Sequence, residues 1–345
     1  MKKKQLYLNF PIIKQITNWA MNNAIYLVLI LLLIVITIIS PDFLKVNNFR
    51  LILTQASTRI IIALGVGGVL ITQGTDLSAG RIVGVGAVLS ASLLQATDYP
   101  YRMYPNLMEL PLIIPMLFTM IICACFGFVN GVIVGMFKVP PFIATLGTMI
   151  IIYGLNSIYF DRPPLGAQPV GGLAENFTTF VQGDLILGSF EIPYLIIYAV
   201  IVIGIIWVLW NRTILGINMY AIGGNIEAAT VSGVSVIKYL LIVYTLAGLL
   251  YGFAGVLEAG RVGSATNNTG NMYELDAIAA CVVGGVSTSG GIGSVSGVVT
   301  GVLIFQIINY GLVFIELSPY LQFIVKGLII VSAVAIDIRK YVRQS

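Results

Sequence analysis

The sequence contains no histidine, and this absence removes several kinds of chemistry at once. A His-based nucleophilic triad, a His metal site and a His proton relay are all excluded. Charge is also scarce, because only 9% of the 345 residues are Asp, Glu, Lys or Arg, against roughly 25% in a soluble domain. The three cysteines all lie inside apolar runs, so we interpret them as small packing residues without a disulfide. The deficit of charge argues against a water-exposed globular fold.

Apolar residues take the place of the missing charge, since 58% of the chain is hydrophobic. A bilayer-spanning helix needs about 20 mostly apolar residues, and such runs follow one another along the sequence. We therefore predict an all-α, polytopic integral membrane protein with about ten transmembrane helices. The third and eighth of these are short for a full crossing, which predicts broken or tilted elements whose free backbone groups face protein or water. The predicted spans are Ala24–Ser40, Leu51–Thr72, Ile82–Gln95, Leu112–Phe137, Phe142–Phe160, Ile192–Trp210, Tyr239–Leu257, Ala277–Val286, Ser294–Phe314 and Tyr320–Ile336.

The basic residues predict the orientation of these spans. With the N-terminus inside, eleven basic residues fall in inside segments and five in outside loops, which is the bias typical of cytoplasmic loops. Both termini are therefore predicted to be cytoplasmic, with a lead of residues 1–23 and a tail of residues 339–345. Between them we expect one transmembrane domain, residues 24–338. Its longest cytoplasmic loop is residues 211–238, and its longest outside loop is residues 161–191.

The cytoplasmic loop carries the stretch GGNIEAATVSGV, which is small and polar although apolar runs lie on both sides. Glu227, Ala228 and Ala229 favour helix, and Asn225 is placed to cap it. The glutamate in the first turn also suits the positive end of the helix dipole. We predict a short helix on the cytoplasmic face that ends near Gly233. The alternative is an ordinary amphipathic loop helix without a partner.

A second polar interruption, TQGTDLSAGR, separates two apolar runs and holds Asp76 as its only acid. One interpretation is a break that contacts a partner subunit or lines a permeation route. The other is an inside turn in which Ser78 or Asp76 caps the next helix. The residues alone do not choose between these two interpretations.

A third block, EAGRVGSATNNTGNMYELDAIAACVVGGVSTSGGIGSVSGVVTGV, runs from Glu258 to Val302. It predicts an outside polar turn, a short span, a cytoplasmic Gly/Ser hinge and a glycine-rich helix face. Gly290 and Gly291 have access to backbone conformations that other residues avoid. Together with Gly80 they are the predicted hinge positions, and tight packing or turn chemistry is the alternative.

Polar residues inside predicted spans are costly in lipid, so a functional role is a reasonable hypothesis for them. Amide and hydroxyl side chains also bond neighbouring helices for stability alone, and both interpretations stay open. Arg59, Gln306 and Lys326 are further polar residues inside predicted spans. The presence of Arg59 there is better explained by a carboxylate or carbonyl partner, or by snorkelling to the outer interface. The candidates for a pathway or gate are Gln55, Asp76, Ser78, Asn130, Thr145, Asn156 and Asn309.

These motifs together resemble one family. Glu-Ala-Ala followed by three residues and Gly is similar to the coupling motif of bacterial ABC importer permeases. Asp-Leu-Ser followed by a small residue and Gly resembles a hallmark of their branched sugar-permease family, whose members serve ribose, galactose and related sugars. The third block resembles the same permeases, and the resemblance runs from about Ala24 to the C-terminus. One departure is that the chain continues as VSVIKYLLIVYTL without the usual proline, which puts the familiar docking geometry in doubt.

The resemblance implies a permease of the bacterial inner membrane that moves galactose or a methyl-galactoside from the periplasm to the cytoplasm. It also implies a homodimer, a cytoplasmic ABC ATPase subunit and a periplasmic galactose-binding protein as partners. No Gly-x-x-x-x-Gly-Lys-Ser/Thr phosphate loop occurs, so ATP hydrolysis is expected on the partner and the chain is not itself an enzyme. No cofactor, metal or nucleic-acid partner is expected. The residues that the resemblance assigns to ATPase coupling are Asn225, Glu227, Ala228, Ala229 and Gly233.

Two alternatives remain. Within the family, ribose or another neutral sugar is possible. From another class, a proton- or sodium-coupled carrier would need a titratable acid near the membrane midplane, and Asp76 and Asp276 are the nearest to such positions. A channel lacks a ring of charge or a filter-like repeat, and an intramembrane hydrolase would need an Asp pair or a Ser–Lys pair. The importer permease is the favoured interpretation.

Overall fold

The computed structural model describes residues 24–162, 166–188 and 190–342. The predicted cytoplasmic lead, residues 1–23, and the end of the tail, residues 343–345, lie outside the described residues. Two compact units are present. One runs from Phe49 to Gln306, and the other pairs the chain up to Asn48 with the chain from Ile307 onward.

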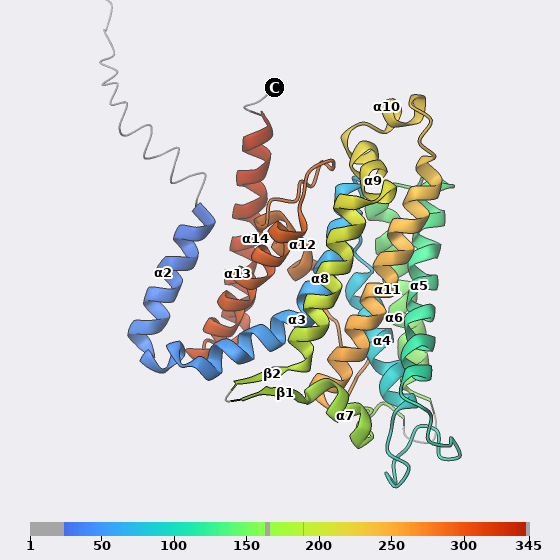
Figure 1. The fold of residues 1–345 in the computed structure, drawn as a ribbon, viewed down its shortest axis with the longest axis vertical. Helices are drawn as coiled ribbons and strands as arrows, with labels where there is room; N and C mark the ends of the chain where they lie inside the picture. Colours follow the sequence, from blue (N-terminus) through green and yellow to red (C-terminus); the bar gives the residue numbers. More distant parts are fainter. Residues whose placement is uncertain (1–23, 163–165, 189, 343–345) are drawn as a thin grey trace, which may run out of the picture. The chain divides into compact units, whose positions relative to one another are not determined.

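The described chain is mostly helical, and each predicted span corresponds to a helix (Figure 1). Six helices within the described residues are long and apolar enough to cross a membrane: α3, α5, α6, α8, α11 and α13. The ten helices that match the predicted spans are α2 (Ala24–Ile39), α3 (Val46–Ile71), α4 (Ala79–Leu93), α5 (Ile113–Gly135), α6 (Pro141–Phe160), α8 (Tyr194–Arg212), α11 (Val236–Val262), α12 (Tyr273–Val283), α13 (Val295–Phe314) and α14 (Pro319–Val342).

The two spans predicted to be short are short in the structure. Helix α4 has 15 residues and α12 has 11, which at 1.5 Å per residue is less than the roughly 30 Å of a bilayer core. Most residues of both helices are buried in protein, where neighbouring segments replace lipid around an incomplete span. This burial explains how incomplete helices persist inside an apolar protein.

The core of the larger unit is built around α11, which packs along both α5 and α4. Glycines permit this close approach: a Cβ added to Gly248 of α11 would lie 2.5 Å from the Cys123 carbonyl oxygen and 3.1 Å from Gly127 Cα on α5. Backbones of neighbouring helices meet in this way when small residues face one another, and dispersion then replaces the hydrophobic effect as the packing force in lipid. The abundance of glycine, 37 residues, therefore has a packing function here.

The two ends of the larger unit carry different small elements (Figure 1). At one end lie α9 (Ile214–Gly224) and α10 (Ile226–Val231). At the other end lie α7 (Glu175–Gln182) and an antiparallel hairpin of β1 (Asp184–Leu187) and β2 (Phe190–Pro193). The predicted loop 161–191 thus has secondary structure of its own, as does the predicted loop 211–238.

The hairpin is fastened to the start of α3 by charge. Arg50 makes ion pairs with Asp184 at 2.6 Å and Glu191 at 3.1 Å. The sequence analysis missed the hairpin because its strands are four residues each, shorter than the runs from which alternation is recognised.

The smaller unit contains α2, the 3-10 turn η1 (Pro41–Leu44), α14 and the end of α13. Phe43 is fully buried and meets the ring of Phe314 edge-on at 5.4 Å. The Tyr310 hydroxyl donates to Asn48 Oδ1 at 2.9 Å. These contacts join the turn after α2 to the end of α13 within this unit.

Candidate functional site

The predicted Glu-Ala-Ala helix is present as α10 and has the expected cap. Asn225 precedes it with extended backbone, and its side-chain oxygen accepts a hydrogen bond from the Ala228 N–H at 2.9 Å. Glu227 lies in the first turn, where a carboxylate is favoured by the helix dipole. Gly233 follows the last turn at φ +85°, a left-handed conformation that suits glycine. Local sequence chemistry therefore determines both ends of this helix.

Most of α10 is exposed. Ala229 is its one buried residue, while Glu227 and Ala228 face outward. Among the described residues, no hydrogen bond or ion pair is made by the Glu227 side chain. A capped helix with a free carboxylate at the end of a membrane bundle is suited to contact another protein. The roles assigned to these residues in ATPase coupling remain predictions.

Beneath α10 is a pocket of about 650 Å³. Ile226 and Thr230, one helical turn apart, line it from α10; the other walls are residues 72–74, 138–141 and 234–237. Its volume falls in the range of small-molecule sites, roughly 300–1,000 Å³. The side of the short helix that carries Ile226 and Thr230 thus borders a hollow, while Ala229 is buried.

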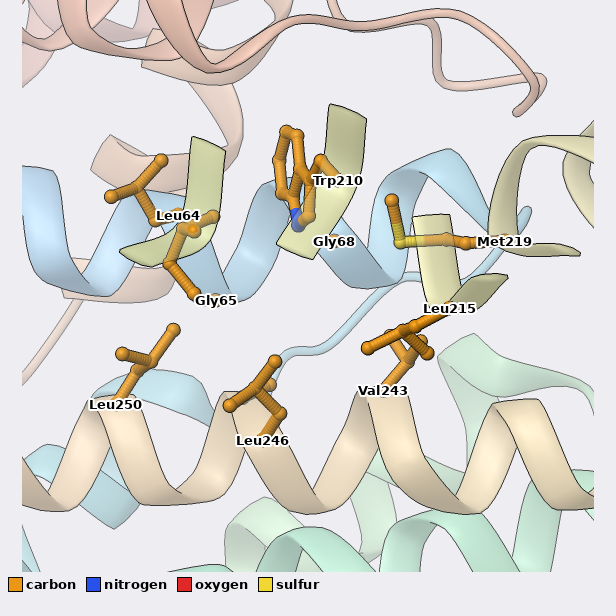
Figure 2. A pocket seen from close by; sticks show the side chains of 11 residues that line it. Leu64, Gly65, Gly68, Trp210, Leu215, Met219, Val243, Leu246 and Leu250 are labelled. Atoms are coloured by element: carbon orange, nitrogen blue, oxygen red, sulfur yellow. The ribbon is translucent and has the colours of Figure 1, made fainter. Parts of the chain in front are cut away.

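A much smaller cavity lies deeper, between α3, α8, α9 and α11 (Figure 2). Leu64, Trp210, Met219 and Leu250 are among its apolar walls. Its volume of about 10 Å³ is close to the minimum for one water molecule, which would also need polar partners. We therefore interpret it as a packing gap and exclude it as a sugar site.

Four of the predicted pathway residues meet in one buried network. Asp76 is 1% exposed, and its Oδ1 accepts from the Ser78 N–H at 2.9 Å and the Ser78 hydroxyl at 2.6 Å. Asn130 of α5 donates from Nδ2 to Ser78 Oγ at 2.8 Å. Thr148 of α6 donates to Asn130 Oδ1 at 2.7 Å. Thr145, also on α6, donates to the Thr75 carbonyl at 2.9 Å and accepts from the Leu77 N–H at 3.1 Å.

This network corrects one expectation about the TQGTDLSAGR stretch. Neither Asp76 nor Ser78 caps α4 by a side-chain hydrogen bond to the helix; the two bond to each other instead. Thr145 of α6 bonds two backbone groups of the stretch, and Asn130 of α5 bonds the Ser78 hydroxyl. Such satisfaction is required because an unpaired buried polar group costs roughly 1–3 kcal/mol.

Replacing Asn130 with leucine is expected to lower the free energy of unfolding by about 1–3 kcal/mol, because Thr148 and Ser78 would each lose a buried partner. Thermal unfolding of the purified protein in detergent is the measurement. Asn211→Leu is the matched control, since Asn211 is exposed at the end of α8. Equal melting temperatures for both variants would contradict a stabilising role for the network.

The remaining candidates lie elsewhere. Gln55 of α3 accepts a hydrogen bond from the Gln306 side chain at 2.9 Å. Asn156 is buried on α6, and Asn309 belongs to the smaller unit. Gly80 lies inside α4 at an ordinary helical conformation, where a side chain would collide with the Gly270 carbonyl and Glu274. A hinge role for Gly80 therefore stays a prediction, while its close packing is a structural fact.

One charged cluster was missed by the sequence analysis. Glu258 is 1% exposed and accepts from Arg261 at 2.8 and 3.0 Å, from the Tyr273 hydroxyl at 2.9 Å and from the Thr58 hydroxyl at 3.1 Å. The Arg59 guanidinium lies over the Tyr273 ring, 3.2 Å from its centroid. The cluster ties α3, α11 and α12 together, and it supplies Arg59 with both an aromatic face and a nearby carboxylate.

The cluster also corrects the predicted start of the outside polar turn. Glu258 and Arg261 lie inside α11, which continues to Val262. Their i, i+3 spacing was the available signal, because opposite charges three residues apart on a helix neutralise one another. The charged pair that the sequence analysis assigned to a turn therefore lies in the last part of a long helix.

Comparison with known proteins places the chain among transport permeases. Residues 48–334 match the model of the family described as branched-chain amino acid transport system / permease component. The chain is 54% identical to the galactose/methyl galactoside import permease protein MglC of Haemophilus influenzae over 97% of both chains. It is also 54% identical to the protein of the same name from Escherichia coli, over 96% of this chain and 98% of that one.

A more distant relative is the ribose import permease protein RbsC of Bacillus subtilis. It is 38% identical over 91% of this chain and 92% of its own length. No solved structure matches the chain.

Proposed function

This chain belongs to the family of branched-chain amino acid transport system permease components, and from that membership we propose its function. It is the permease of an ATP-driven ABC importer, and its substrate is galactose or a methyl-galactoside. The observation that carries the substrate is the 54% identity, over nearly the whole chain, to import permeases for those sugars. The ribose permease is less similar, at 38%, so ribose is the second candidate.

The energy comes from a separate subunit. The sequence holds no phosphate loop, so an ATPase partner must bind and hydrolyse ATP. Helix α10 is the contact for that partner, because it is capped, exposed and carries a free carboxylate at one end of the larger unit. In this proposal Asn225 and Gly233 fix the helix, while Glu227 and Ala228 meet the ATPase and Ala229 packs inward.

In this proposal the end of the larger unit that carries α10 is cytoplasmic. The opposite end, which carries the hairpin (Figure 1), is periplasmic. Basic residues support this orientation, because Arg212 and Lys238 flank α9 and α10. The chain spans the bacterial inner membrane about ten times with both termini in the cytoplasm. A periplasmic galactose-binding protein delivers the sugar to the opposite end, and a second copy of the chain completes the pathway.

The polar network is a gate on the cytoplasmic side of that pathway. Asp76 and Ser78 follow directly after residues 72–74, which line the pocket beneath α10. Tyr244, whose hydroxyl is buried, lines the same pocket. A neutral sugar needs hydroxyl and amide partners and no fixed charge. The network holds such groups in Asn130 and Thr145, which are bonded to protein partners in this structure. Gln55, Asn156 and Asn309 are secondary candidates for the path.

Uptake of labelled galactose into proteoliposomes tests the proposal. The chain is reconstituted alone, with an ATPase subunit, and with both the ATPase and a periplasmic galactose-binding protein. We expect uptake only with both partners and ATP. Competition by unlabelled ribose then decides between the two sugars. Uptake by the chain alone under a proton or sodium gradient would overturn the proposal in favour of a coupled carrier.

A further inference from the structure

The base of α10 rests on a contact between three backbones. Gly223, at the end of α9, lies against the last residue of α3 and against the loop between α12 and α13. A Cβ on Gly223 would collide with the Ile71 carbonyl oxygen and would lie 2.5 Å from the Gly291 nitrogen. The neighbouring Gly224 is different, because a Cβ there meets no atom within 4 Å. Only the first of the two glycines is therefore required by space.

Three hydrogen bonds join these backbones. The Gly291 N–H donates to the Ile71 carbonyl at 2.9 Å, and Gln73 Nε2 donates to the Gly223 carbonyl at 2.9 Å. The Tyr220 hydroxyl of α9 donates to the Gly293 carbonyl at 3.0 Å. We name this set, formed by Ile71, Gln73, Gly223 and Gly291 with Tyr220, the glycine junction.

The backbone at the junction is held in uncommon conformations. Gly290 and Gly291 have φ of +84° and +73°, and Gln73 has φ of +62°. A non-glycine residue at positive φ is uncommon, and such conformations persist when the surroundings over-determine them. The close contacts and hydrogen bonds of the junction hold Gln73 in this uncommon conformation.

The junction contrasts with what lies below α10. Asn225, which caps α10, follows Gly223 by two residues, so the helix begins at the fixed contact. Further along, Ile226 and Thr230 line the 650 Å³ pocket. The helix is thus held at its base, and one of its sides borders a hollow. A force on α10 reaches the bundle at this base and through residues 232–235, which lead into α11.

We propose that the glycine junction passes the displacement of α10 directly to α3 and to the loop between α12 and α13. Gly223, Gly291 and Gln73 are then positioning residues for transport, because they determine which helices move with α10. The elements that receive the displacement also carry other polar residues. Ile71 is the last residue of α3, which carries Gln55 and Arg59. The loop follows α12, which carries Tyr273. This inference rests on the proposed function.

The test compares two adjacent alanine substitutions in the reconstituted importer with its ATPase and binding protein. Gly223→Ala is expected to lower sugar transported per ATP hydrolysed about 5- to 30-fold, the upper part of the range for substitutions that modulate coupling between sites. Gly224→Ala adds the same methyl group in open space and is expected to stay within about twofold of the original chain. Binding of the ATPase, measured by co-purification, is expected to be unchanged in both variants.

A second pair of variants adds no backbone strain. Gln73→Glu removes the donor to the Gly223 carbonyl, whereas Gln73→Lys keeps a donor at a similar reach. We expect a reduced ratio of sugar transported to ATP hydrolysed for Gln73→Glu and a ratio close to that of the original chain for Gln73→Lys. A merely structural role of the side chain would not depend on whether it can donate a hydrogen bond. If Gly223→Ala fails to insert, the Gln73 pair decides.

Equal transport-to-ATP ratios for Gly223→Ala, Gly224→Ala and Gln73→Glu would overturn the inference. That result differs from failure of the proposed function. If the proposed function is wrong, the unmodified chain shows no ATP-dependent uptake and no ATPase co-purification. If only the inference is wrong, the unmodified chain is coupled and the junction variants are coupled equally well.

Discussion

Replacing Glu227 with alanine is expected to lower ATP-driven sugar uptake at least about 30-fold, because truncating one partner of a charged pair at an interface costs roughly 2–5 kcal/mol. The carboxylate is exposed on α10 and has no side-chain partner within the described part of the chain. Alanine favours helix, and the Asn225 cap does not involve the Glu227 side chain. Helix α10 should therefore remain, and only its contact with the ATPase should be lost.

Two measurements check this expectation: sugar uptake into proteoliposomes, and co-purification of the ATPase with the variant. Glu175→Ala is the matched control, since Glu175 is also exposed and lies in the first turn of the short helix α7. That helix lies at the opposite end of the larger unit (Figure 1). Equal loss in both variants would point to a general effect of charge removal. Undiminished uptake with Glu227→Ala would remove α10 as the coupling element.

Replacing Glu258 with leucine is expected to lower the free energy of unfolding by about 3–5 kcal/mol, because removing one partner of a buried ion pair leaves an uncompensated charge. Arg261 would lose both hydrogen bonds, and the Tyr273 and Thr58 hydroxyls would lose their acceptor. Arg59 would lose its nearby negative charge. The contact between α3, α11 and α12 is the part of the structure that should loosen first.

Thermal unfolding in detergent, followed by tryptophan fluorescence, measures the effect. A double variant, Glu258→Leu with Arg261→Leu, is the decisive comparison, because replacing both members of a buried pair by apolar residues is often close to neutral. We expect the double variant to unfold at a higher temperature than Glu258→Leu alone. A double variant no more stable than Glu258→Leu would show that the charges do not depend on one another.

The helices could be predicted because their signals are local. An apolar run of about 20 residues has few alternatives to a helix in lipid, where every backbone group must be bonded within the segment. Helix α10 could be predicted for a similar reason: Asn225 and Gly233 act on backbone groups within three residues of themselves. Elements without strong local signals, such as the four-residue strands of the hairpin, were missed.

The partners of polar residues could not be predicted, because they depend on which faces of distant helices meet. Asp76, Asn130 and Thr145 were each candidates because of their polarity. Their hydrogen-bonded network, however, requires α5 and α6 to pack beside the break between α3 and α4. Glu258 was assigned to a turn because the sequence does not reveal Tyr273 and Thr58 beside it.

The sequence by itself determined that this chain is a membrane permease: its scarcity of charge, its apolar runs and its ordered motifs are properties of the chain alone. Tertiary structure decided which of two adjacent glycines matters. Gly223 and Gly224 are the same residue type in adjacent positions, but an added Cβ would meet the backbone of α3 and of the loop after α12 only at Gly223. The reason is geometric. Whether a residue is closely packed depends on which segment lies against it, and the sequence of one segment does not specify the other.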